Sequence, residues 1–237
     1  MGRQEALDQY NHALRAGQKY YKAAVSRGGY PYPLVLDDIL DETAVVGRAS
    51  IGLVNIPSEL IVGTKTAGRV SALAGNFMPL LDEGTEFAAK WISLCEAHLS
   101  EEGIRDPVKC FEYMGKFYVQ EGNKRVSVLK YLGATSIWAN VTRIVPVPTD
   151  SKENRIYYEF INIHDHTQLI YFWFREEGGF TRLLEATGPT DRRWTEAERK
   201  ELASVYLRFA PAFQAAGGEK LPITSSDALL AYINVYG

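Results

Sequence analysis

Apolar residues follow a helical spacing in some stretches of the chain and cluster into extended runs in others. In residues 3–25, Ala6, Tyr10 and Leu14 fall on one side of a helix, which predicts an amphipathic helix that the glycines at 28 and 29 end. Residues 85–99 repeat this spacing and predict a second long helix. Further helices are expected near residues 37–40 and at 126–132, 180–186, 195–216 and 225–236.

Runs of β-branched and aromatic residues predict strands at 51–56, 108–113, 116–119, 137–147 and 170–174. Met114 and Gly115 lie between two of these runs and predict a hairpin turn. Residues 155–163 fit either a helix or a strand. Residues 63–84 have no strong periodicity, and such long loops in compact domains are commonly functional. Together these elements predict an α+β (mixed α/β) fold.

The composition changes after Thr149, which predicts three parts. They are an N-terminal helix and linker (1–50), a central α+β domain (51–149) and a mixed, mainly helical C-terminal subdomain packed on it (150–237). Thr195 and Glu198 have the spacing of a capping box at a helix start. The last predicted helix reaches almost to the end of the sequence, so we expect a further domain beyond Gly237 as a partner within a longer chain.

The composition excludes several classes of protein. The chain has 237 residues, of which 46% are hydrophobic and 23% are charged, and its net charge of -3 creates no general attraction for nucleic acid. Its uncharged stretches are too short and too polar to span a membrane. Two cysteines, Cys95 and Cys110, do not make a disulfide framework, which indicates a reduced, cytoplasmic protein.

The segment from Phe117 to Gly133 carries the strongest chemical signal. It begins as a strand, turns at Gly122 and continues as a short helix, so that Asn123, Lys124 and Arg125 lie where the helix begins. A helix N-terminus offers free N–H groups and the positive end of the helix dipole. Two cations and a glycine at this point predict an anion site. A solvated basic helix cap is the simpler alternative.

The order of elements from Val54 to Val141 extends this pattern. A short strand, an irregular loop and a helix lead to the segment Gly103–Pro107, and a hairpin then leads to Gly122–Arg125 and a helix ending in Leu132 and Gly133. This order resembles the N-terminal domain of the ParB/sulfiredoxin-like superfamily over residues 51–145. The resemblance implies that the domain binds a nucleoside triphosphate, usually with Mg²⁺, at the Gly-x-x-Arg box.

The resemblance also implies roles for individual residues. Gly122 and Asn123 would donate backbone N–H groups to phosphates, and Lys124 and Arg125 would neutralise them. Arg69 matches a family arginine, whereas Lys65 lies nearby without a family position. The wall of the pocket would be shaped by Gly103, Ile104 and Pro107, with Arg105 at a variable position between them.

This chain differs from the family's pattern at two points, and each difference argues against one of the family's functions. Sulfiredoxin-type reductases need a cysteine where this chain has Asn123, which excludes their sulfinic-acid chemistry. The segment after Asp150 has no helix-turn-helix pattern, which weakens a role in DNA partition. We therefore expect a nucleotide-binding domain for CTP or ATP that regulates an attached domain or a partner. The alternatives are a DNA-binding module using the same basic pocket, and a nucleotidase or phosphotransferase with Glu121 or Glu102 as base.

His164 and His166 flank Asp165 with the spacing of a metal-binding pair. No further cysteine or histidine cluster lies near them in the sequence. A surface turn or a packed histidine pair is the simpler interpretation, and we expect no metal held by the protein alone.

Overall fold

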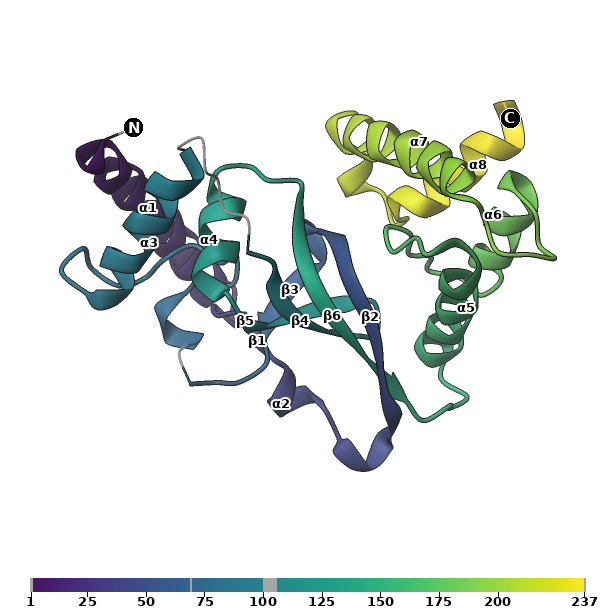
Figure 1. Ribbon diagram of the computed structural model, residues 1–237, viewed down its shortest axis with the longest axis horizontal. Helices are drawn as coiled ribbons and strands as arrows, with labels where there is room; N and C mark the ends of the chain where they lie inside the picture. The colour runs from purple at the N-terminus through teal and green to yellow at the C-terminus, as the bar shows by residue number, and fades with distance from the viewer. Residues whose placement is uncertain (1, 69, 100–105, 237) are drawn as a thin grey trace. The chain divides into compact units, whose positions relative to one another are not determined.

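The computed structural model describes residues 2–68, 70–99 and 106–236 (Figure 1). They form two compact units, Met1–Pro146 and Val147–Gly237. Residues 1–50, predicted as a separate helix and linker, belong to the same unit as the central domain. Helices and a mixed sheet combine in an α+β fold, as the sequence predicts. That the second unit packs on the first stays a prediction.

The described residues of the first unit contain a six-stranded mixed sheet. Across the sheet, the strands are β1 (Leu34–Val35), β3 (Ile61–Thr64), β5 (Lys116–Glu121), β4 (Val108–Tyr113), β6 (Ser136–Pro146) and β2 (Val45–Pro57). Strands β4 and β5 form the predicted antiparallel hairpin. Met114 and Gly115 have φ values of 52° and 74°, the positive values that a two-residue hairpin turn requires.

One face of the sheet is buried and the other is partly exposed. On β6, Ile137, Ala139 and Val141 are buried, whereas Trp138 between them is 56% exposed. This alternation follows from the two-residue period of a strand. Three helices gather on one side of the sheet, as Figure 1 shows: α1 (Arg3–Ser26), α3 (Glu86–Leu99) and α4 (Asn123–Tyr131).

Trp91 on α3 joins these three helices. Its ring is fully buried and meets Tyr10 of α1 and Tyr131 of α4 edge-on, with centroid distances of 5.3 and 5.6 Å. Its indole Nε1 atom donates a hydrogen bond of 2.9 Å to Oγ of Ser127 on α4. Such edge-to-face pairs favour one relative orientation of the rings. The Trp91 contacts therefore set the position of α4 against α3.

Short elements complete the first unit. Helix α2 (Leu36–Ile39) places Leu36 against Tyr118 and Ile144 on the sheet. The 3₁₀ turns are η1 (Glu42–Ala44), η2 (Ser58–Leu60) and η3 (Val70–Ala72). Apart from the end of β3, η3 and a bridge between Leu73 and Pro79, the described residues within 63–84 are irregular, as predicted. No helix among the described residues has the length and apolar character to cross a membrane.

The secondary-structure elements described in the second unit are all helices. Its helices are α5 (Lys152–Thr167), α6 (Gly179–Thr187), α7 (Glu196–Ala215), η4 (Gly218–Lys220) and α8 (Ser225–Tyr236). Residues 155–163, whose sequence fits either a helix or a strand, lie in α5. The predicted capping box forms at the start of α7, where Thr195 and Glu198 bond each other's backbone N–H groups.

The predicted strand at residues 170–174 is wrong, because this segment is irregular. Phe172 and Phe174 are buried, which explains the strand-like pattern. Among the described residues, no strand pairs with the backbone of Trp173. Instead, its N–H donates to Oγ of Ser226 at 3.0 Å, and its carbonyl accepts from the hydroxyl of Thr224 at 2.6 Å. The start of α8 thus replaces a sheet partner.

Lys130 on α4 gives a pH-dependent test of this packing. Its Nζ atom donates to the carbonyl of Ile61 at 3.0 Å and lies 5.2 Å from the ring centre of Phe77. Burial lowers the pKa of Lys130 from 10.5 to about 8, against a smaller opposite effect of the Glu59 carboxylate.

Because the folded state releases this proton before the unfolded state does, stability should rise with pH between these two pKa values. Between pH 8 and 10.5, we expect the free energy of unfolding of the wild type to rise by about 3 kcal/mol more than that of Lys130→Met. Urea unfolding of both proteins at several pH values measures this difference. Parallel pH profiles would contradict the burial of the ammonium group.

Candidate functional site

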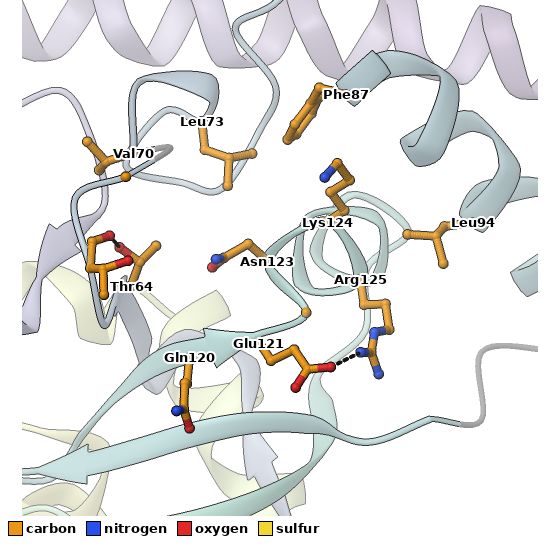
Figure 2. A pocket seen from close by; sticks show the side chains of 13 residues that line it. Thr64, Val70, Leu73, Phe87, Leu94, Gln120, Glu121, Asn123, Lys124 and Arg125 are labelled. Carbon is orange, nitrogen blue, oxygen red and sulfur yellow. Dashed lines mark hydrogen bonds and ion pairs between the residues drawn. The ribbon is translucent and has the colours of Figure 1, made fainter. Parts of the chain in front are cut away.

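A cavity of about 500 Å³ opens in the first unit where β5 leads into α4. The loop after β3, one side of α3 and the β5–α4 junction form its walls (Figure 2). Small-molecule sites typically have volumes of about 300–1,000 Å³. The lining residues are Thr64, Thr66, Gly68, Val70, Leu73, Phe87, Leu94, Gln120, Glu121, Gly122, Asn123, Lys124 and Arg125.

Gly122 allows β5 to turn into α4. It directly precedes the helix and has a φ value of 104°, which residues with a side chain rarely adopt. A Cβ atom at this position would lie 2.8 Å from Cγ1 of Val108 on β4. Glycine has no side chain to cap the helix, and no side chain among the described residues takes the capping position at the start of α4.

Asn123 and Lys124 begin α4 and line the cavity. Figure 2 shows the Lys124 side chain directed toward Phe87, and its Nζ atom lies 5.1 Å from the centre of that ring. The Oδ1 atom of Asn123 is buried and has no hydrogen-bond partner among the described residues. A buried amide atom without a partner destabilises the folded state. A polar ligand in the cavity could supply that partner.

Arg125 lines the cavity but also acts within the protein. Its Nη1 atom donates to the main-chain carbonyls of Asp106 and Pro107, at 2.9 Å each. Its Nη2 atom lies 3.9 Å from Oε1 of Glu121. The guanidinium therefore holds the segment that enters β4 against the start of α4. Its predicted contact with phosphate stays a prediction, and any such contact would have to use Nε or Nη2.

Glu121 lies at the rim of the cavity at the end of β5. Lys109 on the neighbouring strand β4 approaches its carboxylate at 2.7 Å. The hydrogen bond and charge of Lys109, with a smaller effect of Arg125, lower the pKa of Glu121 below its usual range. A carboxylate with a lowered pKa is a weaker base, so this arrangement disfavours Glu121 as a general base.

The structure does not bring all of the predicted site residues together. Gly122, Asn123, Lys124, Arg125 and Glu121 meet at the cavity. Lys65 is not among the lining residues, because its ammonium pairs with Asp37 at 2.8 Å. Pro107 contributes the carbonyl that Arg125 holds. The remaining predicted residues lie outside the described residues: Arg69, Glu102, Gly103, Ile104 and Arg105.

Several lining residues carry no strong functional signal in the sequence. Thr64 and Thr66 line the cavity on either side of Lys65, and the two-residue period of extended backbone could have indicated that they point opposite to it. Phe87 and Leu94 lie on the apolar side of α3 that also carries Trp91, and both line the cavity. Helical periodicity does not distinguish a core face from the wall of a cavity.

The two histidines of the predicted pair lie on α5 in different surroundings. His164 is buried on α5 with its ring 6.0 Å from that of Phe160, whereas Nδ1 of His166 bonds the carbonyl of Asn162. His164 is packed, whereas His166 bonds its own helix, so neither a surface turn nor a packed histidine pair describes both residues. The described residues contain no group of three or more histidine, cysteine or acidic side chains placed to hold a metal ion.

Both cysteines are buried and unpaired with each other, within the described parts of the chain. Burial raises the pKa of the Cys110 thiol to about 12 and that of Cys95 above its usual range. Because the thiolate is the reactive form, these cysteines are poor nucleophiles at neutral pH. The cavity at α4 therefore remains the strongest candidate site.

Comparison of the chain with protein-family models, curated proteins and solved structures finds no match.

Proposed function

We propose that the first unit is a ParB/sulfiredoxin-like domain that binds a nucleoside triphosphate, with its phosphates at the start of α4. The observation that carries this proposal is a cavity lined by the glycine-led N-terminus of a helix and by Lys124. Phosphate oxygens would accept hydrogen bonds from the N–H groups of the first helical turn. The Lys124 ammonium would exchange part of its contact with the Phe87 ring for a stronger charge–charge interaction.

Mg²⁺ would accompany the nucleotide. This ion prefers phosphate oxygens and water, and proteins usually add one or two carboxylates. Glu121 at the rim is the acidic side chain among the described lining residues, and its lowered pKa keeps it ionised. The domain therefore has a carboxylate able to meet a metal ion carried by the phosphates, directly or through water.

Binding without turnover fits the site better than catalysis. The Glu121 carboxylate already forms an ion pair with Lys109, and its lowered pKa makes it a weak proton acceptor. We therefore propose that nucleotide binding regulates an attached domain or a partner. The same cavity could instead bind a DNA backbone phosphate, but the net charge of -3 provides no general attraction for DNA.

The test is a nucleotide titration followed by thermal unfolding. We expect CTP or ATP with Mg²⁺, at about 100 times its dissociation constant, to stabilise the protein by about 2.7 kcal/mol. In Lys124→Ala, the affinity should fall about 10- to 100-fold, because a charge-assisted hydrogen bond is lost. Lys22→Ala, an exposed lysine of α1 outside the cavity, is the matched control and should bind like the wild type.

Three outcomes would contradict the proposal. The first is the absence of a thermal shift with any nucleotide at millimolar concentration. The second is retention on duplex DNA that falls with salt and depends on Lys124, which would support the DNA-binding alternative. The third is release of phosphate that stops in Glu121→Gln, which would support an enzyme.

A further inference from the structure

A second cavity of about 320 Å³ lies beside the first. Gly68 and Phe87 line both cavities, so the two adjoin at these residues. The second cavity has a different chemistry. Lys124 and the start of α4 line only the first, whereas Ser71, Thr85 and Glu86 line only the second. One cavity thus favours an anion and the other favours a neutral group with hydrogen-bond donors.

Individual contacts sharpen this difference. The hydroxyl of Thr85 donates to the carbonyl of Asp82 at 2.9 Å and accepts from the N–H of Ala88 at 3.2 Å, so it caps α3. The Glu86 carboxylate pairs with Lys90 at 2.5 Å but is largely exposed. A phosphate in the second cavity would meet this carboxylate, and like charges repel. Phosphate groups should therefore bind in the first cavity, at the start of α4, and not in the second.

We infer that the second cavity is the binding site for the nucleoside half of the ligand. This inference rests on the proposed function, since it assumes that the triphosphate lies at α4. The sugar and base would pass between Gly68 and Phe87, with the Phe87 ring as an apolar contact surface. The hydroxyl of Ser71 and the carboxylate of Glu86 would meet ribose hydroxyls or an amino group of the base.

Two substitutions can narrow the route from the first cavity into the second without replacing Lys124 or any residue at the start of α4. Ser71 is exposed and lines only the second cavity, so Ser71→Tyr should narrow that cavity without disturbing the core. A Cβ atom on Gly68 would meet no atom within 4 Å, so a side chain can start there, and we expect Gly68→Leu to narrow the junction. Ser93→Tyr, at an exposed position of α3 outside both cavities, is the matched control.

The experiment compares two probes by calorimetric titration: inorganic tripolyphosphate, and CTP or ATP, each with Mg²⁺. In Ser71→Tyr, we expect the affinity for the better nucleotide to fall at least 10-fold, while the affinity for tripolyphosphate stays within 2-fold of the wild type. Gly68→Leu should show the same preferential loss of nucleotide affinity. Ser93→Tyr should bind both probes like the wild type, and retained tripolyphosphate binding shows that each variant is folded.

The results separate this inference from the proposed function. If the wild type binds tripolyphosphate as tightly as nucleotides, the nucleoside half has no site of its own and the inference is overturned. Unchanged nucleotide affinity in both cavity variants would overturn it as well. If the wild type binds neither probe, the proposed function itself fails, and the inference fails with it.

Discussion

Replacing Glu112 by alanine is expected to lower the free energy of unfolding by about 3–5 kcal/mol. Glu112 on β4 pairs with Arg143 on β6 at 2.5 Å, and the two side chains are only 1% and 4% exposed. The substitution leaves the Arg143 guanidinium buried without this carboxylate. The N–H of Gly115 also loses its acceptor, Oε1 of Glu112 at 2.8 Å, which weakens the hairpin turn. Urea unfolding at pH 7 measures the change.

Two further variants test the cause of this loss. Glu112→Gln keeps an oxygen for the Gly115 N–H but removes the charge, so its stability should fall between those of the wild type and Glu112→Ala. The double variant Glu112→Leu with Arg143→Met removes both charges and should recover most of the loss, since an apolar pair of similar volume often replaces a buried ion pair. A loss below about 1 kcal/mol in Glu112→Ala, as for surface pairs, would contradict the role of the buried pair.

Gly122→Ala is expected to cost about 2–4 kcal/mol of stability and to remove nucleotide binding. The backbone there has a φ value of 104°, and a non-glycine residue in such a conformation costs about 1–3 kcal/mol. The new Cβ atom would also lie 2.8 Å from Cγ1 of Val108 and 3.3 Å from Nε of Arg125. Relief of these contacts must move the start of α4 away from β4. Thermal unfolding with and without nucleotide measures both effects.

Gly133→Ala is the matched control on the other end of the same helix. Gly133 also has a positive φ, of 79°, but a Cβ atom there would meet no atom within 4 Å. In this variant, stability should fall only by the amount that the strained backbone costs, and the nucleotide affinity should stay unchanged. Equal losses of stability and binding in both variants would contradict a specific role for the Gly122 position.

The secondary structure was predictable where local signals agreed. Residues 225–236 were expected as a helix and form α8 over the same residues. Thr195 and Glu198 were expected to cap a helix and do so. The strand at 170–174 failed because aromatic burial imitates a strand pattern, whereas Trp173 bonds Thr224 and Ser226, which lie about fifty residues later in the chain. No local pattern contains that contact.

The candidate site was predictable only in part. Gly122 at a strand–helix junction followed from a turn residue between two periodic segments. Lys65 was grouped with the site because it is basic and lies in the neighbouring loop, but Asp37, 28 residues earlier, pairs with it. Phe87 lines both cavities, although its place on the apolar side of α3 gives no sign of a site. Charge and periodicity show what a side chain can contact, not what lies opposite it.

Local patterns were enough to place most elements and to put a glycine, an asparagine and two cations at the start of α4, because periodicity and turn chemistry act between residues a few positions apart. Only tertiary contacts decide that these two cations have different partners. The Nζ atom of Lys124 lies over the ring of Phe87, 37 positions away in sequence, and Arg125 holds carbonyls 18 and 19 positions earlier. Short-range sequence patterns carry no information on such distant partners, because only packing of the helices on the sheet brings them together.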